Sequence, residues 1–386
     1  MKRIETVKEY SAPPFTDAFV RTLKALSVRM EDVRVFDIET TGLTPKSAII
    51  YLIGIARLEG DTLITTQLLA ESFDDEETVL RAFCEELKGC RLLLHFNGDR
   101  FDLPFVAARC ARFGIETHVT ISPDEKEADI LSFDLYKKVT PVKKILGLPD
   151  CRLKSIERLL NIERKDEMGG GELIEVFEEY ALRPTPEAEA LLLLHNADDI
   201  AGTFSLLPVL TFYDFFSSLQ EEAFCGASLQ TKTYTAFDGL TKKECYLTLE
   251  VATPLPASFS SRKENLHLRY ENNHFFLRIP VVTGTYKHFF PDYKNYYYLP
   301  YEDMAVHKSV GEFVDKNFRK NATKEEAFVK KEGDFLFAPC DFGLPVFKER
   351  LKDKLLYIEN SEDLSSSESN LIAYGISILR YFAGFS

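Results

Sequence analysis

Two carboxylates on one face of a predicted strand place the strongest constraint on how this chain can fold. Residues 33–36 form an apolar run typical of a buried strand, and Asp37-Ile38-Glu39-Thr40-Thr41-Gly42 continues it into a turn. Side chains alternate between the faces of a strand, so Asp37 and Glu39 project together, about 7 Å apart. Two such charges beside a buried strand are costly unless something compensates them, and divalent cations would do so.

The segments after this strand indicate the fold class. Apolar runs at 49–56 and 62–69 predict two more strands and, with the first, an antiparallel meander. Helix and strand patterns then alternate at 76–87, 91–96 and 103–113, and residues 153–212 are almost entirely helical in pattern. We therefore expect an α/β fold with a mixed sheet flanked by helices.

The length of 386 residues suggests two domains. We expect an N-terminal extension at 1–30, the α/β domain at 31–215, and a smaller α+β accessory domain of unknown role at 216–386. Strand patterns in the last segment occur at 245–251, 266–270, 275–282, 296–299, 327–331 and 334–337, and helix patterns at 301–319 and 366–382.

Charge and cysteine content narrow the function classes. With 47 basic and 61 acidic residues the net charge is −14, which excludes nucleic-acid binding through bulk positive charge. Its seven cysteines are scattered without a C-x-x-C pair, which is typical of reduced thiols and argues against a structural zinc site. No signal-peptide pattern or long apolar run is evident, so we expect a cytoplasmic protein without a membrane partner.

A second acidic motif follows the predicted strand at 91–96. In Asn97-Gly98-Asp99-Arg100-Phe101-Asp102-Leu103-Pro104 the Asn-Gly pair predicts a turn, and Asp102 opens the next helix. Asp102 on its own would be interpreted as a helix N-cap. Beside the first motif, a metal ligand becomes the stronger interpretation.

A third motif lies in the long predicted helix at 187–210. His195 and Asp199 are four residues apart and therefore share a face of the helix. By itself this pair would be an ordinary polar face, so its meaning depends on the other two motifs.

In their order and spacing, the three motifs resemble those of the DEDD 3′→5′ exonucleases of the ribonuclease H-like superfamily. Asn97-Gly-x-x-Phe101-Asp102-x-Pro104 and the later Arg152-Leu-Lys-Ser-Ile-Glu157 resemble, more narrowly, the YprB-type predicted exonucleases. The resemblance covers residues 33–207, about half of the chain, and does not reach the C-terminal segment.

The resemblance implies a site and a chemistry. Asp37, Glu39, Asp102 and Asp199 match the four metal-binding carboxylates of the family, which would hold two divalent cations, Mg²⁺ or Mn²⁺, for phosphodiester hydrolysis. His195 stands at the spacing of the family's Tyr-type branch, in the place of the tyrosine. With an ordinary pKa of about 6.5, histidine is a credible general base.

The expected partner is nucleic acid, most simply a single-stranded 3′ end. Seven basic and two acidic residues lie between 137 and 158. We predict that Lys143, Lys144 and Lys154 line a groove to the metals; the alternative is a solvated helix face. Thr40 and Asn97, beside the carboxylates, are also expected to contact substrate.

Two other functions remain open at this stage. One is a non-catalytic nucleic-acid-binding module on the same fold, which the complete set of four carboxylates disfavours, because negative charge repels phosphate. The other is a structure-specific endonuclease with the same metals. DNA and RNA are equally compatible with the sequence, since no pattern locates a contact to a 2′-hydroxyl. Protein partners and oligomeric state are equally open.

Overall fold

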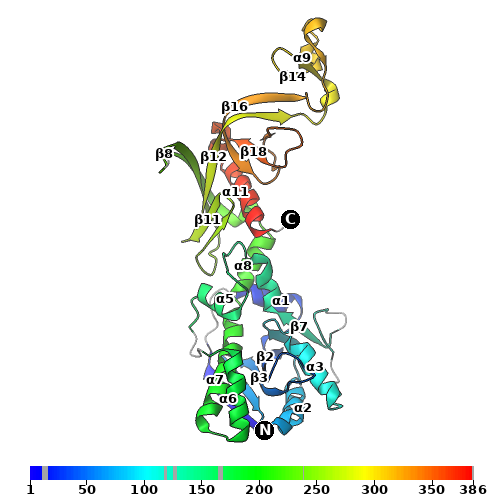
Figure 1. Cartoon of the computed structure of the whole chain (residues 1–386), viewed down its shortest axis with the longest axis vertical. Helices are drawn as coiled ribbons and strands as arrows, with labels where there is room; N and C mark the ends of the chain where they lie inside the picture. The colour runs from blue at the N-terminus through cyan, green and yellow to red at the C-terminus, as the bar shows by residue number, and fades with distance from the viewer. Residues whose placement is uncertain (11–15, 117–119, 125–127, 164–167, 238, 385–386) are drawn as a thin grey trace. The chain divides into compact units, whose positions relative to one another are not determined.

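The chain forms two compact units, each built around its own sheet (Figure 1). The computed structural model describes residues 1–10, 16–116, 120–124, 128–163, 168–237 and 239–384. Unit 1 comprises Met1–Lys143, Leu148–Asp214 and Leu255–Ala257, and unit 2 comprises Lys144–Gly147, Phe215–Pro254 and Ser258–Ser386.

Unit 1 contains a seven-stranded mixed sheet with strand order β1-β4-β3-β2-β5-β7-β6. The pairs β1–β4, β4–β3 and β3–β2 are antiparallel, and β2–β5, β5–β7 and β7–β6 are parallel. The strands are β1 (Lys2–Glu9), β2 (Val33–Thr40), β3 (Ile50–Glu59), β4 (Thr62–Leu69), β5 (Leu92–His95), β6 (Ile121–Ser122) and β7 (Ile130–Asp134). The predicted meander of three antiparallel strands is therefore confirmed.

The helices of unit 1 follow the predicted alternation. They are α1 (Asp17–Ala25), α2 (Glu76–Glu86), α3 (Asp102–Arg112), α4 (Leu135–Val142), α5 (Leu153–Leu159), α6 (Gly170–Leu182), α7 (Pro186–Ser205) and α8 (Val209–Ser217), the last crossing the division between the units. Helix α2 packs on β3 and on α3, while α7 packs on β2 and β3 and lies beside α6 (Figure 1).

The central strand β2 shows why this layering forms. Phe36 is buried against Phe83 of α2, with ring centroids 5.6 Å apart. Asp37 and Glu39 alternate with Phe36 and Ile38, and Asp37 contacts Asn196 of α7, on the other layer. The strand thus places Phe36 and Ile38 on one face, toward α2, and the two carboxylates on the other, toward α7.

The first residues of the chain belong to unit 1. Strand β1 pairs with β4 from Lys2↔Leu69 to Glu9↔Thr62 and forms an edge of the sheet. Helix α1 buries Ala18, Phe19 and Leu23. The segment 1–30, which we expected to be an extension, therefore adds a strand and a helix to unit 1.

The long apolar helix predicted at 187–210 is present as α7. Thr185 is its N-cap, since the side-chain oxygen accepts a hydrogen bond from the Ala188 N–H at 3.2 Å, and Pro186 occupies the first turn. By length and composition the helical segment Pro186–Ser217 could cross a membrane, a possibility that the short apolar runs had not suggested. However, 61% of its most apolar window is buried inside the protein, as in a core helix.

Unit 2 is rich in β-structure. Its main sheet has the order β10-β11-β12-β16-β18-β17, with β9 pairing with both β12 and β8. The main strands are β8 (Phe224–Thr235), β9 (Thr241–Val251), β10 (Phe259–Lys263), β11 (Leu266–Glu271), β12 (His274–Phe289), β16 (Phe328–Ala338), β17 (Val346–Phe347) and β18 (Leu356–Glu359). Helix α11 (Glu368–Ala383), preceded by the short α10 (Glu362–Ser366), packs on β8, β9 and β16.

The helix predicted at 301–319 is wrong. A small sheet of β13 (Tyr296–Leu299), β14 (Met304–His307) and β15 (Lys320–Asn321) takes its place, with only the short α9 (Lys308–Gly311) and a 3₁₀ turn at Lys316–Phe318. Asp303 adopts a φ of 48°, which ends a tight turn between β13 and β14, and its carboxylate accepts a hydrogen bond from the Tyr298 hydroxyl. The pairing of β13 with β14 is therefore favoured over the helix that the pattern at 301–319 predicted.

Candidate functional site

The predicted acidic residues meet in one cleft of unit 1. The cleft has a volume of about 710 Å³ and runs over the ends of β2 and β5, the start of α3 and the middle of α7. Its lining contains all five of the predicted catalytic residues: Asp37, Glu39, Asp102, His195 and Asp199. Residues separated by more than 160 positions in the sequence therefore face the same space.

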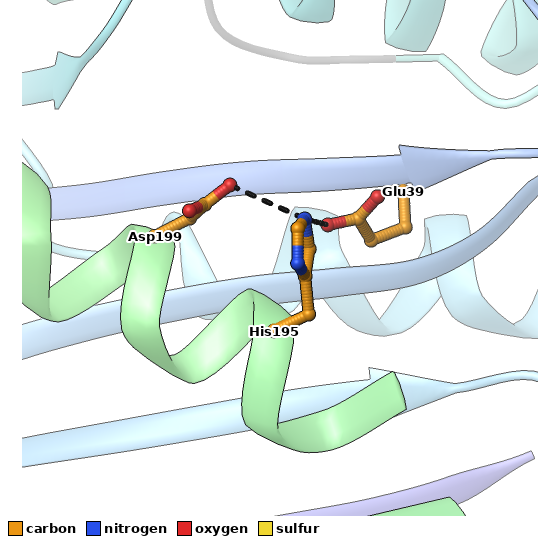
Figure 2. A group of neighbouring side chains, drawn as sticks. All are labelled: Glu39, His195 and Asp199. Atoms are coloured by element: carbon orange, nitrogen blue, oxygen red, sulfur yellow. Dashed lines mark ion pairs between the residues drawn. The ribbon is translucent and has the colours of Figure 1, made fainter. Parts of the chain in front are cut away.

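His195 lies between two of the carboxylates. Its Nε2 atom is 3.5 Å from Oε1 of Glu39 and 3.6 Å from Oδ2 of Asp199 (Figure 2). These three side chains bring their ligand atoms within 4.8 Å of one another, which is close enough to surround one cation. The imidazole could therefore act as a base or as a nitrogen ligand, and the helical spacing of four residues accounts for its approach to Asp199.

Asp37 carries the strongest electrostatic cost in the cleft. Burial is the largest cause that holds the pKa of its carboxyl well above the ordinary value, and the charges of Asp199, Glu39 and Asp102 raise it further. A hydrogen bond of 3.1 Å from Asn196 Nδ2 to Asp37 Oδ2 offsets part of this cost. Negative charge is thus concentrated here beyond what the described hydrogen bonds neutralise.

Asp102 lines the cleft and does not cap helix α3. Phe101 occupies the N-cap position of α3, while Oδ1 of Asp102 accepts a hydrogen bond of 3.3 Å from the Ile38 N–H on the adjacent strand. Burial raises the pKa of Asp102 to about 7, helped by the charges of Asp134 and Asp199 and opposed by hydrogen bonds from its own and the Ile38 backbone. The side chain therefore joins α3 to β2 at the cleft.

Asn196 is a residue that the sequence analysis missed. It is fully buried, and its Oδ1 accepts a hydrogen bond of 3.0 Å from Gln67 Nε2 of β4. Gly54 of β3 leaves room for it, because a Cβ atom at that position would lie 2.1 Å from Asn196 Oδ1. Asn196 follows His195 directly in the third motif, so its position between His195 and Asp199 was the available signal.

A polar cluster behind the cleft holds the second motif in place. Oδ1 of Asp134 accepts the N–H of Asn97 at 2.7 Å, and Nδ1 of His95 accepts the N–H of Gly98 at 3.1 Å. Asn97 has a φ of 65°, and a Cβ on Gly98 would lie 2.6 Å from the His95 ring, which explains the Asn-Gly pair. The turn that precedes Asp102 is therefore fixed by buried side chains.

This cluster is a poor cation site despite its ligand types. His95, Asp99 and Asp134 have ligand atoms within 4.8 Å of one another. However, Asp99 is 2.5 Å from Lys137 Nζ and accepts the Ser132 hydroxyl, and His95 Nε2 lies 2.7 Å from that hydroxyl oxygen. Its polar atoms already have partners, so we interpret the cluster as structural.

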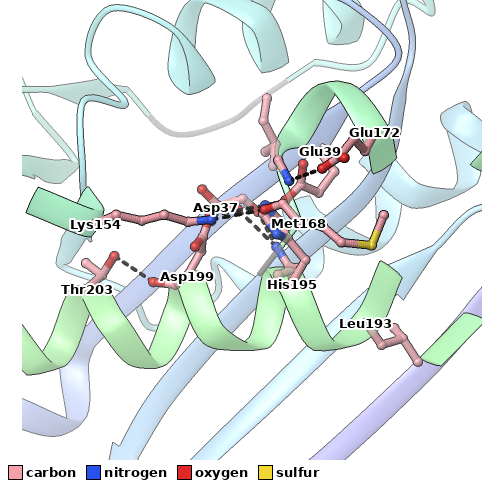
Figure 3. A network of polar contacts seen from close by, with 12 residues as sticks. Asp37, Glu39, Lys154, Met168, Glu172, Leu193, His195, Asp199 and Thr203 are labelled. Carbon is pink, nitrogen blue, oxygen red and sulfur yellow. Dashed lines mark hydrogen bonds and ion pairs between the residues drawn. The ribbon is translucent and has the colours of Figure 1, made fainter. Parts of the chain in front are cut away.

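The predicted substrate-binding residues separate into two groups. Asn97 and Lys143 line the cleft, together with Arg152, one of the seven basic residues between 137 and 158. Among the described residues, the lining does not include Thr40, Lys144 or Lys154. The hydroxyl of Thr40 donates to Gly42 O at 2.9 Å, and Lys154 Nζ donates to Met168 O at 3.0 Å (Figure 3).

Aromatic side chains, also missed at the sequence level, complete the wall. Phe96, Phe101 and Tyr136 also line the cleft, and Phe96 and Tyr136 contact each other edge to face, with ring centroids 5.8 Å apart. Aromatic faces next to cations suit flat heterocycles carried on a charged backbone. The site therefore combines acidic, basic and aromatic groups.

Residues 35–211 match the family model described as the RNase_H superfamily. Comparison with curated proteins found no match. The matched part forms a mixed sheet flanked by helices with a ribonuclease H-like fold, followed by a β-rich unit, so the predicted fold class is confirmed.

Solved structures of nucleic-acid enzymes are similar over part of the chain. The family B DNA polymerase from the hyperthermophilic archaeon Pyrobaculum calidifontis is 18% identical with a TM-score of 0.38, covering 48% of this chain and 25% of that one. A structure of exonuclease I is 13% identical with a TM-score of 0.32, covering 57% and 55%. E. coli exonuclease I in complex with a 5cy-dA13 oligonucleotide is 12% identical with a TM-score of 0.31, covering 57% and 54%. This chain thus spans about a quarter of the polymerase and just over half of exonuclease I.

Proposed function

We propose that unit 1 is a nuclease of the DEDD type that removes nucleotides from the 3′ end of DNA or RNA with the help of two divalent cations. The observation that carries this proposal is the convergence of Asp37, Glu39, Asp102 and Asp199 with His195 in one cleft of a ribonuclease H-like sheet. The narrower likeness to YprB-type proteins rests on the second motif and on the segment from Arg152 to Glu157.

The donor set fits Mg²⁺ or Mn²⁺. Four carboxylates offer hard oxygen ligands, which these cations prefer. Burial is the largest cause that raises the pKa of Asp37, and the charges of three neighbouring carboxylates raise it further, which is what a cluster of cation ligands produces. Asp37, Glu39, Asp102 and Asp199 would hold the cations, which would supply stabilisation of the charge that develops on the reacting phosphate.

The residues of the chain have distinct tasks in this proposal. Asn196 fixes the Asp37 carboxylate through its hydrogen bond of 3.1 Å. His195, from its position between Glu39 and Asp199, would take the proton of the attacking water at Nε2. Lys143 and Arg152 would contact phosphate oxygens, and Phe101 and Tyr136 would contact the terminal base.

The direct test is degradation of end-labelled single-stranded and double-stranded DNA and RNA in Mg²⁺, Mn²⁺ or EDTA. We expect metal-dependent shortening from the 3′ end that is absent with EDTA and lost in Asp37→Asn. Removal of the base in His195→Ala should lower the rate by about 10²–10⁴-fold. Lys46→Ala, at an exposed lysine outside the lining, is the matched control.

Other results would select the competing functions. Internal cleavage of substrates with blocked ends would indicate that the protein is an endonuclease and not an exonuclease. Oligonucleotide binding without cleavage of any substrate in either metal would indicate a binding module on this fold. Unchanged cleavage by Asp37→Asn would show that the acidic cleft takes no part in the reaction.

A further inference from the structure

A second open face, in unit 2, carries a transverse row of cationic and aromatic side chains. The in-register pairs Arg262↔His267, His267↔Arg278 and Arg278↔Tyr246 cross the strands β10, β11, β12 and β9. The next residues along these strands, such as Leu268, are buried on the other face. The row therefore lies on the solvent side, with neighbouring members about 4.8 Å apart between strands.

Three members of the row, Arg262, His267 and Arg278, line a basic cleft. This cleft has a volume of about 650 Å³, and the titratable side chains in its lining include two lysines, two arginines, one histidine and one carboxylate: Lys242, Lys243, Arg262, Arg278, His267 and Glu244. The whole chain has a net charge of −14, so this cleft has the opposite sign of charge to the chain as a whole.

The one carboxylate in this lining is already engaged. Glu244 is buried and accepts hydrogen bonds of 2.9 Å from the hydroxyls of Tyr234 and Tyr246. Its Oε1 also lies 3.5 Å from Arg278 Nη1. Outside the lining, Asp334 pairs with Lys243 at 2.7 Å. With both carboxylates counted, the four lysine and arginine charges still exceed the negative charge by two.

The positive charges of the cleft act on His267. Burial is the first cause that lowers the pKa of this imidazole, and the positive charges of Arg278 and Arg262 lower it further. A lowered histidine pKa beside two arginines indicates a place that favours anions over additional cations.

Aromatic rings share the same face. Lys232 Nζ lies 4.9 Å from the Tyr246 ring centroid, and the Arg269 guanidinium lies 5.0 Å from that of Phe276. Phe276 is two residues before Arg278 on β12, so it lies on the same side of the sheet. Unpaired bases could stack on these rings in place of the cations, at about 1–3 kcal/mol for each base.

We propose that this face of unit 2, from Arg262 across Arg278 to Tyr246, binds single-stranded nucleic acid through its phosphates and bases. Cations alone would suit any polyanion, but cations with aromatic rings match a polymer of phosphates and flat bases. This inference rests on the proposed function, because it assigns to unit 2 the holding of the polymer that unit 1 would cleave.

The test is fluorescence anisotropy of labelled oligothymidylate and oligouridylate with the full chain in EDTA, over a range of salt. Lys242→Ala/Arg262→Ala removes two exposed cations of the cleft. Lys352→Ala/Lys354→Ala removes two exposed lysines outside it and is the matched control. Loss of two phosphate contacts should weaken binding about 25-fold at 0.1 M salt and lower the slope of log K against log[salt] by about 1.4.

A third variant tests the aromatic part. Phe276→Leu keeps an apolar side chain on β12 but removes the ring, and we expect binding about 5-fold weaker or more, with the salt slope unchanged. Equal affinity of all variants and of the unchanged protein would overturn the proposal. Competition by polyglutamate as strong as that by oligothymidylate would also overturn it, in favour of an acidic protein partner.

Cleavage measurements separate this inference from the proposed function. On a substrate of two or three nucleotides, Lys242→Ala/Arg262→Ala should keep the Mg²⁺-dependent rate of the unchanged protein, while longer substrates show a raised KM. If the unchanged protein has no nuclease activity but the Lys242→Ala/Arg262→Ala variant binds oligonucleotides more weakly than it does, the proposed binding face of unit 2 is supported and the proposed nuclease function is refuted. If the unchanged protein cleaves its substrate and the variant binds oligonucleotides equally well, the nuclease function is supported and the binding face of unit 2 is refuted.

Discussion

At the scale of single residues, the acidic cleft depends on side chains that do not themselves carry the proposed chemistry. Asn196 holds Asp37, Gln67 holds Asn196, and the Asp134 carboxylate holds the N–H of Asn97. Each of these contacts orients a group at the cleft from a different element. Supporting side chains of this kind commonly change metal affinity or activity when they are replaced.

Replacement of Asn196 tests this dependence. In Asn196→Ala the Asp37 carboxylate loses its hydrogen bond, so we expect metal-dependent activity to fall about 10–100-fold. Asn370→Ala, at an asparagine of α11 in unit 2, should have no effect. The measurement is the rate of cleavage against Mg²⁺ concentration. A rate equal to that of the unchanged protein at all concentrations would show that Asn196 positions nothing.

Because His95 is buried, we expect the folding stability of unit 1 to depend on pH. Burial lowers the pKa of its imidazole, with the charges of Asp134 and Asp99 opposing this. The unfolded chain therefore binds the proton first as the pH falls below about 6.5, and the stability contributed by neutral His95 is complete above that pH and lost below it.

Chemical denaturation at pH 7.5, 6.5 and 5.5 measures this effect. Relative to the unchanged protein, His95→Asn should lower the pH dependence of the free energy of unfolding below pH 6.5, by up to about 1.4 kcal/mol per pH unit, the limit for one proton. His307→Asn, at an exposed histidine of unit 2, is the control. Parallel pH profiles for all three proteins would contradict the assignment of a neutral buried imidazole.

At the scale of elements, the contact of α7 with β3 decides where the third motif lies. Gly54 allows the helix to approach, since a Cβ there would meet Asn196 Oδ1 at 2.1 Å. Gly54→Ala therefore forces the helix or the asparagine to shift. We expect it to destabilise the protein by about 1–3 kcal/mol and to lower activity with it.

The matched control for this prediction is Gly171→Ala in α6, where an added Cβ has no neighbour within 4 Å. That change should be neutral or slightly stabilising, because alanine favours a helix by up to about 1 kcal/mol over glycine. Thermal unfolding of both variants measures the difference. A Gly54→Ala protein as stable and active as Gly171→Ala would mean that α7 does not depend on this close approach.

At the scale of the whole molecule, the acidic cleft links metal binding to stability. Four carboxylates repel one another around buried Asp37, so the folded state without cations carries an electrostatic cost. A cation that binds only the folded state raises stability with its concentration.

Two measurements of thermal unfolding test this link. Mg²⁺ or Mn²⁺ should raise the Tm of the unchanged protein, by an amount that grows with concentration. In EDTA, Asp37→Asn should unfold at a higher Tm than the unchanged protein, and the cations should then have little further effect on it. An Asp37→Asn protein that is stabilised by the cations as much as the unchanged protein would exclude this cleft as their site.

The sequence determined the local pieces of the site. Apolar runs were enough to predict the meander and the strand–helix alternation, because strand and helix periods are local properties. The set of Asp37, Glu39, Asp102 and Asp199 came from the resemblance of the three motifs to those of the DEDD exonucleases. The N-cap Thr185 and the turn at Asn97-Gly98 follow from their own chemistry in the same way.

Only the tertiary structure decided how those pieces meet. Contacts between distant positions, such as Asn196 with Asp37 or Asp134 with Asn97, depend on strand order and helix packing, which no local pattern encodes. The helix predicted at 301–319 was displaced by β14 and β15, since the pairing of both strands with β13 outweighed local propensity. The basic face of unit 2 likewise exists only in the register of the sheet, where Arg262, His267 and Arg278 become neighbours.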